Sequence, residues 1–388
     1  MKKILIVNNN MYIGGVQKAL VNLLWNIHGD YDISLLLFHR GGECLDELPP
    51  DVKIIAPCRA WSYLGMAGKD AKSPVDKLCR SFFAAISRLF GRKYSIAIMS
   101  LFQKKLRGYD AAISYLHNAG DKLFYGGCND FVLRHVDAEK KITVLHCDYL
   151  NSGANTAENS RRYADFDIIA ACSEGCARAF LKANPKLEAK LHVLHNCHRF
   201  DKILESAAKD PQTLSEDKIN IVTVARFGKE KGVTRAIEAV AKLGENKDKI
   251  QLCLVGDGAE RSAIEARISE NGLSDCVTLC GMRENPYGFI KAADLLFIPS
   301  VSEAAPLVIG EAACLGTPVL STETSSAREM IEHSGIGWVC ENSVEAMTRA
   351  LEDIIRNPDK LKTKKEELSL RSFDNQSAIS GFAALFEI

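Results

Sequence analysis

Residues 299–313 read PSVSEAAPLVIGEAA and follow the apolar run LLFI at 295–298. The apolar run predicts a buried strand, and the Pro-Ser pair after it predicts a loop. Pro306 suits the first turn of a helix, because its missing N–H would have no partner there. The sequence therefore places Glu303 in a strand-to-helix loop. It places Glu311 inside the helix, on the same face as Leu307.

The start of this predicted helix has the chemistry of a nucleotide site. The first turn offers unpaired N–H groups and partial positive charge, which favour an anion such as phosphate. Glu311, one turn further in, can accept hydrogen bonds from a pair of hydroxyl groups. Together these groups fit a phosphate joined to a ribose.

Length and composition narrow the class of protein. A chain of 388 residues is too long for one ordinary core and predicts about two domains. The formal net charge is zero, which gives no electrostatic reason to expect nucleic acid as a partner. Thirteen cysteines without a secretory leader indicate a reducing cytosol with free thiols. No apolar run is long enough to predict a membrane span.

Short apolar runs predict two series of buried parallel strands. In the first half, residues 4–7, Gly14-Gly15 and the helical stretch 16–27 form a strand, a glycine loop and a helix, the start of a doubly wound α/β domain. Further strands are predicted at 33–38, 52–56, 111–115, 142–146, 168–171 and 192–194. A polar segment at 199–218 separates them from strands at 219–224, 250–255, 277–280, 295–299 and 318–321. We expect a domain boundary near residue 200 and a ligand cleft at the carboxyl ends of the strands.

Two loops that follow strands of the second half indicate the kind of ligand that the protein binds. Arg226 and Lys231 follow residues 219–224, and two cations at the carboxyl end of a strand can neutralise a diphosphate. Gly256-Asp257-Gly258 lacks the third glycine of a dinucleotide fingerprint, because Arg261 stands at that position. The second loop therefore disfavours NAD or FAD.

Histidines occur at the ends of two predicted strands and in one cluster. His117 and His146 end strands of the first half, where they would face the cleft. His192, His195 and His198 invite a zinc site, but residues three apart on a strand point to opposite faces. The cysteine spacings also lack the C-x2-C pattern of structural zinc, so we expect no metal.

Four features together resemble the retaining, nucleotide-sugar-dependent glycosyltransferases of family 4, which have the GT-B fold of two Rossmann-like doubly wound domains facing a cleft. They are Gly14-Gly15, the pair Arg226 and Lys231, the Asn285-Pro286-Tyr287 segment, and Glu303-x7-Glu311. The resemblance covers nearly the whole chain. One departure is Ala304-Ala305, where the family has Gly and an aromatic residue or Leu, and this bears on sugar preference.

The resemblance implies a role for each candidate residue. The catalytic residues would be Glu303, Arg226, Lys231 and His117, and the acceptor-binding residues His146 and Asp148. The donor-binding residues would be Gly14, Gly15, Gly256, Gly258, Arg283, Leu307, Val308 and Glu311. The implied domains are an acceptor-binding domain at 1–199, a nucleotide-sugar-binding domain at 200–370, and a C-terminal helix at 371–388 that returns to the first domain.

The implied activity is a retaining, metal-independent hexosyl transfer without a cofactor. The donor would be a nucleotide-diphosphate sugar, with UDP favoured over GDP. The acceptor would be a hydroxyl of a glycan or glycolipid, in capsule or other bacterial surface polysaccharide assembly. We expect a cytoplasmic protein, with peripheral attachment to the inner face of the membrane as an open question.

That question arises from a basic amphipathic insertion at 65–107. It could lie on an anionic lipid surface, or it could pack its apolar side on the first domain and leave its charges in water. Two rival functions also stay open. A nucleotide-sugar epimerase of the same fold would need no acceptor, and a non-catalytic nucleotide-sugar-binding protein would be expected to lose the phosphate-site charges that this chain keeps.

Overall fold

The computed structural model describes residues 1–387, which form two compact units. The first unit comprises Met1–Cys197 together with the C-terminal segment that starts at Asn375, and the second comprises His198–Asp374. The chain therefore passes between the units twice. The first passage, after Cys197, lies close to the domain boundary expected near residue 200.

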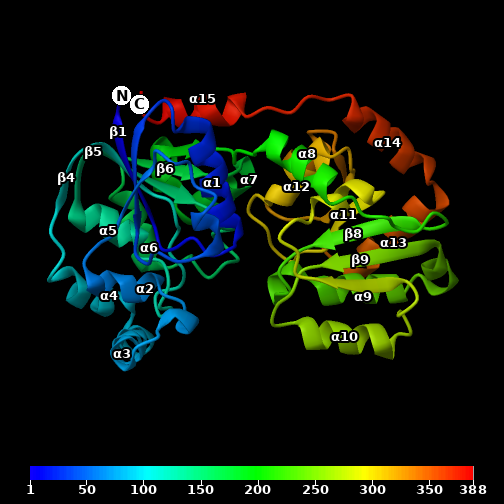
Figure 1. Cartoon of the computed structure of the whole chain (residues 1–388), viewed down its shortest axis with the longest axis horizontal. Coiled ribbons are helices and arrows are strands. Elements are labelled where there is room, and N and C mark those ends of the chain that lie inside the picture. The colour runs from blue at the N-terminus through cyan, green and yellow to red at the C-terminus, as the bar shows by residue number, and fades with distance from the viewer. Residues whose placement is uncertain (388) are drawn as a thin grey trace. The chain divides into compact units, whose positions relative to one another are not determined.

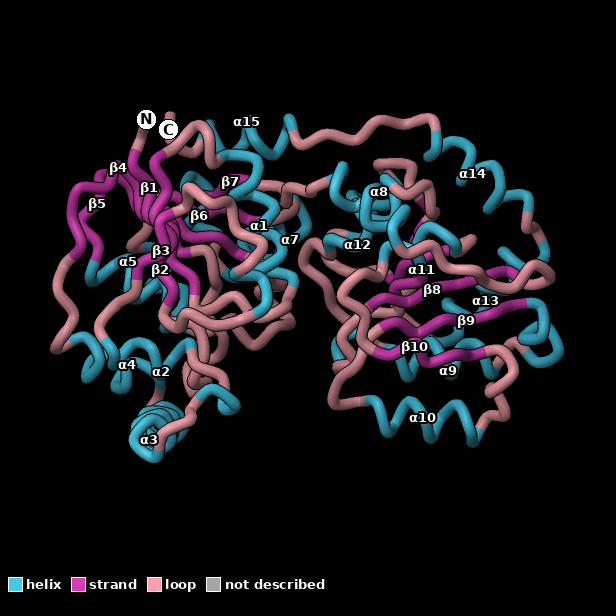
Figure 2. The backbone as a smooth tube through the Cα atoms, in the orientation of Figure 1, coloured by secondary structure: helices cyan, strands magenta, loops and turns pink. Residues whose placement is uncertain are grey.

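The first unit contains a seven-stranded sheet in the order β3-β2-β1-β4-β5-β6-β7 (Figures 1 and 2). All of its strand pairs are parallel. Its strands are β1 (Lys3–Asn8), β2 (Asp32–Leu37), β3 (Lys53–Ile55), β4 (Leu106–Ser114), β5 (Val136–Leu145), β6 (Ile168–Ala171) and β7 (Leu191–Val193). Each one overlaps a predicted strand, because buried parallel strands are continuous apolar runs.

The helices of the first unit include an insertion between β3 and β4. The insertion consists of α2 (Arg59–Gly65), α3 (Pro74–Phe90) and α4 (Arg92–Ser100). The other helices are α1 (Gly15–Ile27), α5 (Cys128–His135), α6 (Ala157–Ala164), α7 (Glu174–Ala183) and α15 (Gln376–Ala384). Helix α15 lies against the first unit, where the Tyr31 ring contacts Phe382 and Phe386 with centroids 5.6 and 5.4 Å apart.

The second unit contains a six-stranded parallel sheet in the order β10-β9-β8-β11-β12-β13. Its strands are β8 (Ile219–Val224), β9 (Ile250–Val255), β10 (Val277–Gly281), β11 (Leu295–Ile298), β12 (Val319–Thr322) and β13 (Gly337–Cys340). Its helices are α8 (Phe200–Lys209), α9 (Val233–Ala241), α10 (Arg261–Glu270), α11 (Tyr287–Ala292), α12 (Leu307–Cys314), α13 (Val344–Arg356) and α14 (Asp359–Ser369). Strand β13, at the sheet edge, was not predicted.

Both sheets reverse their strand order at one point. In the first unit β1 lies between β2 and β4, and in the second unit β8 lies between β9 and β11. At such a switch point the loops after the two strands diverge, and open α/β sheets bind ligands there. The predicted α/β fold with two doubly wound sheets is confirmed. No helix among residues 1–387 is long and apolar enough to cross a membrane.

Candidate active site

The switch point of the second unit brings Lys231 and Glu303 together. Strands β8 and β11 are neighbours, with Ile221 paired to Leu295, so the loops that follow them lie side by side. The Lys231 Nζ atom lies 2.7 Å from Glu303 Oε1. The Ser300 hydroxyl donates a second bond of 2.8 Å to the same oxygen. Two predicted catalytic residues that are far apart in sequence thus form one ion pair.

Backbone contacts hold this ion pair in place. The Val301 N–H donates to the Glu230 carbonyl at 2.8 Å, which joins the two loops directly. Gly232 has a φ of +63°, and a Cβ atom there would lie 2.2 Å from the Pro299 carbonyl oxygen. The Glu303 side chain is only 11% exposed, against 26% for Lys231. The carboxylate is therefore largely shielded from water and oriented by fixed donors.

Arg226 is placed differently from Lys231. Its guanidinium pairs with Glu230 at 2.6 Å, and 73% of the side chain is exposed. A surface ion pair of this kind is weak, so the guanidinium can exchange Glu230 for a diphosphate at little cost.

The loops after β8 and β9 are joined by hydrogen bonds between their backbones. The Ala225 N–H donates to the Val255 carbonyl, Phe227 to Asp257, and Glu260 to Phe227, at 3.1, 2.8 and 2.9 Å. Gly256 and Gly258 lie inside this junction. A Cβ atom on Gly256 would be 1.9 Å from the Ala225 carbonyl oxygen, and one on Gly258 would be 2.6 Å from that of Phe227. The predicted donor-binding glycines are thus required for the close approach of the two loops.

Helix α12 carries the predicted nucleotide contacts. Leu307 and Val308 are its first two residues, and Pro306 directly precedes it. Glu311 lies one turn further in, where the Tyr287 hydroxyl donates to its Oε1 atom at 3.4 Å. Arg283 lies with α11, since its guanidinium carbon is 5.7 Å from the centre of the Phe289 ring.

His198 supports the start of α12, a role that the sequence did not predict. Its Nε2 atom lies 3.1 Å from the Leu307 carbonyl oxygen. A Cβ atom on Gly310 would lie 2.5 Å from the same nitrogen, so only glycine admits the ring at this distance. A glycine within a helix is a signal of such close packing, and Gly310 could have drawn attention to it.

The switch point of the first unit contains the other candidates. Gly14 ends the loop after β1, and Gly15 is the first residue of α1. His117 follows β4, which pairs with β1 through Val7 and Ser114. These residues belong to the first unit and the ion pair of Lys231 and Glu303 to the second.

His117 and His146 are both neutral at pH 7. Burial lowers the pKa of the His117 ring to about 4. Burial, and then the charge of His117, lowers the pKa of His146 to about 3. Among the described residues, His117 Nδ1 and His146 Nε2 have no hydrogen-bond partner. Neutral rings with an open nitrogen can bond to sugar hydroxyls.

Asp148 is occupied by its own turn. Its Oδ1 atom accepts bonds from the N–H groups of Leu150 and Asn151 at 3.2 and 3.3 Å. Its Oδ2 atom accepts from Asn151 Nδ2 at 2.8 Å. The side chain therefore holds the turn after β5. No group of three or more His, Cys, Asp or Glu side chains that could hold a metal occurs among residues 1–387.

Residues 205–368, which include Arg226, Lys231, Glu303 and Glu311, match the family described as glycosyl transferases group 1. The matched residues all lie in the second unit, whose sequence is that of a group 1 glycosyl transferase. Among curated members, it is 31% identical to the amylovoran biosynthesis glycosyltransferase AmsK of Erwinia amylovora over 142 residues, which cover 34% of this chain and 35% of that protein. It is 28% identical to the lipopolysaccharide core biosynthesis glycosyltransferase LpsD of Rhizobium meliloti over 201 residues, or 51% of this chain and 57% of that protein. The chain thus spans about a third to just over half of the curated relatives that it matches.

Solved glycosyltransferase structures share the whole fold. The crystal structure of Anabaena HepE in complex with UDP-glucose superposes with a TM-score of 0.69 at 17% identity and covers 100% of both chains. WaaG, a glycosyltransferase involved in lipopolysaccharide biosynthesis, superposes with a TM-score of 0.58 at 16% identity, covering 98% of this chain and 99% of that one. The GT-B fold expected for a group 1 glycosyltransferase is confirmed.

Proposed function

We propose that this group 1 glycosyltransferase is a retaining, metal-independent enzyme that transfers a hexosyl group from a UDP-sugar to a hydroxyl of a glycan or glycolipid. The observation that carries the proposal is the ion pair of Lys231 and Glu303 at the switch point. The family match and the UDP-glucose complex of HepE support it. The names of AmsK and LpsD support surface polysaccharide assembly as the setting.

The reaction breaks the bond between the anomeric carbon and the diphosphate oxygen. Lys231, Arg226 and the N–H groups of Leu307 and Val308 stabilise the charge that develops on the departing diphosphate. These positive groups take the part that a metal ion has in other transferases. Glu311 accepts hydrogen bonds from the ribose hydroxyls.

The acceptor hydroxyl then attacks the oxocarbenium-like anomeric carbon on the face that the diphosphate leaves. Its proton passes to the leaving phosphate. Because attack and departure take place on the same face, the configuration is retained without a protein nucleophile. Glu303, held by Lys231 and Ser300, bonds to the donor sugar. The neutral rings of His117 and His146 bond to sugar hydroxyls, His117 on the donor and His146 on the acceptor.

Thermal unfolding with nucleotides tests the donor proposal. UDP or UDP-glucose at 100 times its dissociation constant is expected to stabilise the wild type by about 2.7 kcal/mol, with EDTA present throughout. GDP at the same concentration is expected to stabilise it less. Absence of a shift with every nucleotide would contradict nucleotide-sugar binding, and a shift that EDTA abolishes would contradict metal independence.

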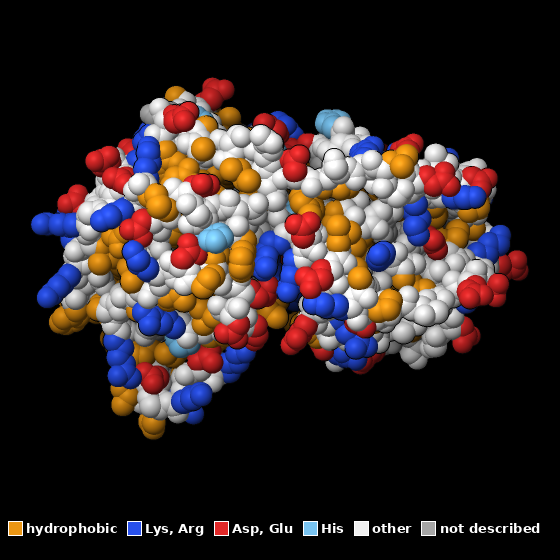
Figure 3. All heavy atoms as spheres, turned by 45° about the horizontal axis from the view of Figure 1, so that its top comes forward, with side chains coloured by type: hydrophobic (Ala, Val, Ile, Leu, Met, Phe, Trp, Pro, Cys, Tyr) orange, Lys and Arg blue, Asp and Glu red, His pale blue; other side chains and the backbone are white. Residues whose placement is uncertain are grey.

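We also propose that the α3–α4 surface attaches the enzyme to an anionic membrane. This surface comprises Val75, Leu78, Phe82, Leu89, Phe90, Leu101 and Phe102, all exposed. Leu78, Phe82 and Leu89 form a stripe on α3 and are 72, 53 and 67% exposed. Residues 77–109 contain eight Lys and Arg residues and no Asp or Glu. Figure 3 shows apolar and basic side chains together on the projection at the lower left.

The exposed stripe favours lipid over the alternative of simple packing. Of the α3 side chains, only Phe83 and Ser87 are buried, so the helix leaves most of its large apolar residues in water. An amphipathic helix with flanking cations buries such residues among acyl chains while its charges meet anionic headgroups. The absence of carboxylates from residues 77–109 removes repulsion from those headgroups.

Flotation with vesicles of phosphatidylglycerol and phosphatidylcholine tests this attachment. The wild type is expected to float at low salt and less so at high salt, because salt screens the electrostatic attraction. The double variant Phe82→Glu, Leu89→Glu is expected to remain in solution. Leu370→Glu, at a site 88% exposed in the second unit, is the matched control and should float like the wild type. Wild-type protein that ignores these vesicles would overturn the proposal.

A further inference from the structure

The loop between β4 and α5 carries His117 and has no regular structure of its own for most of its length. It runs from Tyr115 to Gly127. An irregular segment must satisfy its carbonyl groups outside itself when water is excluded. Within the loop the Leu123 N–H donates to the Gly120 carbonyl at 3.0 Å, and further carbonyl groups of the loop accept from other elements.

Arg92, the first residue of α4, supplies most of these donors. Its side chain is buried, with the residue 2% exposed. The Nη1 atom donates to the carbonyl oxygens of Tyr125 at 2.9 Å and of Ala119 and Gly120 at 3.3 Å. The Arg92 backbone N–H donates to the Asp121 carbonyl at 2.7 Å. One residue of the insertion thus binds four carbonyl groups of the His117 loop.

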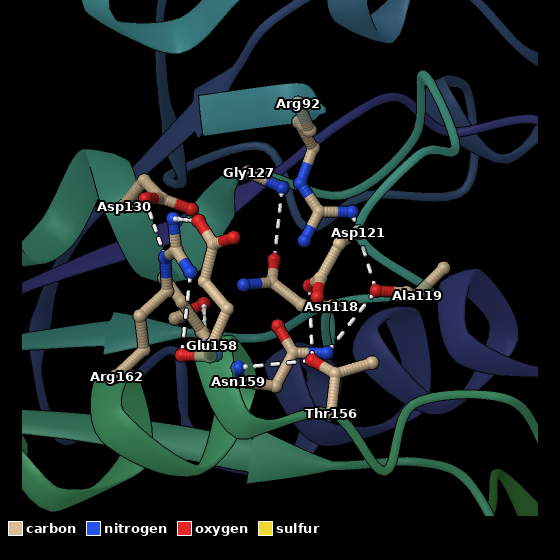
Figure 4. Close-up of polar contacts among 12 residues, drawn as sticks. Arg92, Asn118, Ala119, Asp121, Gly127, Asp130, Thr156, Glu158, Asn159 and Arg162 are labelled. Carbon is tan, nitrogen blue, oxygen red and sulfur yellow. Dashed lines mark hydrogen bonds and ion pairs between the residues drawn. The ribbon is translucent and has the colours of Figure 1, made fainter. Parts of the chain in front are cut away.

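Helix α6 holds the opposite side of the loop. Asn159 Nδ2 donates to the Ala119 carbonyl at 3.1 Å, and the Thr156 hydroxyl donates to Asp121 Oδ1 at 2.9 Å. Within the loop, Asn118 Oδ1 accepts from the Gly127 N–H at 3.0 Å. Figure 4 shows Arg92 approaching from one side and Thr156 with Asn159 from the other.

The bonds of Arg92 indicate positioning and not ion pairing. The nearby carboxylate Asp130 is taken by Arg162, with 2.6 Å between Oδ1 and Nε. A buried guanidinium is costly unless it is hydrogen-bonded. Here Nη1 makes the bonds found for the side chain, all to carbonyl groups of one loop, and Nε has no partner among the described residues. A lysine side chain is one bond shorter, so its ammonium group would fall short of the position from which Nη1 reaches these carbonyl groups.

We propose that Arg92 is a positioning residue for the transferase reaction, because it fixes the loop that presents His117. The inference rests on the proposed function only for the role of His117. It also joins the insertion to the site, since the α3–α4 surface and Arg92 belong to the same pair of helices.

The test compares Arg92→Met with Ser95→Ala. Ser95 is buried one turn along α4, and its hydroxyl bonds to Ser87 Oγ and the Phe83 carbonyl of α3, both at 2.8 Å, and not to the loop. In Arg92→Met, amide hydrogen exchange of residues 116–127 is expected to accelerate about tenfold or more in the free protein. The pKa of His117, followed by NMR, is expected to rise from about 4 toward its ordinary value as the ring meets water. Ser95→Ala should change neither quantity.

Kinetics on UDP-glucose, with hydrolysis as the minimal reaction, complete the test. Arg92→Met is expected to lower kcat about 100-fold, because small displacements of a reacting group have effects of this size. The Kd for UDP should stay unchanged, since Lys231, Arg226 and Glu311 belong to the second unit. If UDP does not bind the wild type, the proposed function fails while the exchange and NMR results still decide the loop proposal.

Two further results would overturn the proposal for Arg92. Unchanged exchange and an unchanged His117 pKa in folded Arg92→Met would overturn the inference, as would equal changes in Ser95→Ala. If Arg92→Met does not fold, Arg92→Lys takes its place. That variant keeps the charge but has a side chain one bond shorter, and it is expected to loosen the loop where Ser95→Ala does not. Wild-type loop exchange in Arg92→Lys would then overturn the proposal.

Discussion

Replacing Lys231 by methionine is expected to lower turnover of the UDP-sugar by about 100- to 1,000-fold, the usual effect of removing one donor to a developing negative charge. The ammonium group has two tasks that methionine cannot perform. It pairs with Glu303 at 2.7 Å, and it stands where the diphosphate must leave. Without it, a carboxylate that is only 11% exposed keeps the Ser300 hydroxyl but loses its cation. The measurement is kcat in steady state on purified protein.

Lys229→Met is the matched control for this variant. Lys229 lies two residues away in the same loop and is exposed. It is expected to leave kcat within about twofold of the wild type, because exposed charges contribute little. If the two variants were equally active, Lys231 would not be part of the reaction, and the ion pair would be an element of stability alone.

The variant Glu311→Ala is expected to weaken UDP binding by at least about 100-fold, because hydrogen bonds to a charged group contribute about 1.5–3 kcal/mol each and a ribose offers two hydroxyls. Titration calorimetry with UDP and with uridine separates the two parts of the ligand. Glu311→Ala should weaken both ligands, since they share the ribose. Lys231→Met should weaken UDP and leave uridine unchanged.

Tyr287→Phe serves as the control for Glu311. It removes the long bond of 3.4 Å to Oε1 but leaves the carboxylate in place. Its effect on UDP affinity should be below about threefold, as a bond of this length contributes little. Wild-type uridine affinity in Glu311→Ala would exclude the ribose contact.

The strands could be predicted almost completely from sequence, and the exception is informative. Strand β13 has the sequence Gly337-Trp338-Val339-Cys340, and all four residues are only half-buried. It lies at the edge of the sheet, and only a short apolar run, Trp338 to Cys340, marks it. Its pairing with β12 depends on a neighbour that the local sequence does not reveal.

The site was predictable to the level of loops but not of side-chain contacts. Apolar runs and glycines locate the loops after β8, β11 and β4, and the order of the strands makes the first two neighbours. Which atoms meet is a matter of tertiary structure. The bonds that Asp148 accepts from its own turn, for example, cannot be read from the sequence.

Arg92 shows why burial is harder to predict than periodicity. In the sequence it stands beside Lys93 within a basic amphipathic stretch and looks like one more solvated charge. That interpretation is wrong. Gly91 has a φ of +102°, which ends α3 and starts α4 in a new direction, so the helical phase of the preceding residues no longer applies. The turn at glycine points the next side chain inward.

The hydrogen-bonded loops after β8 and β9 lower the entropy cost of binding the donor. Fixing the backbone of one mobile residue costs roughly 1–2 kcal/mol, and a binding loop of several residues would have to recover that from its contacts with the ligand. Here Ala225 and Phe227 are already tied to Val255 and Asp257 before any ligand arrives. Only side chains such as that of Arg226 remain to be ordered. The backbone of these loops is therefore already ordered when the protein folds. Little of the binding energy of the diphosphate is needed to order it, and that energy can stabilise the transition state instead.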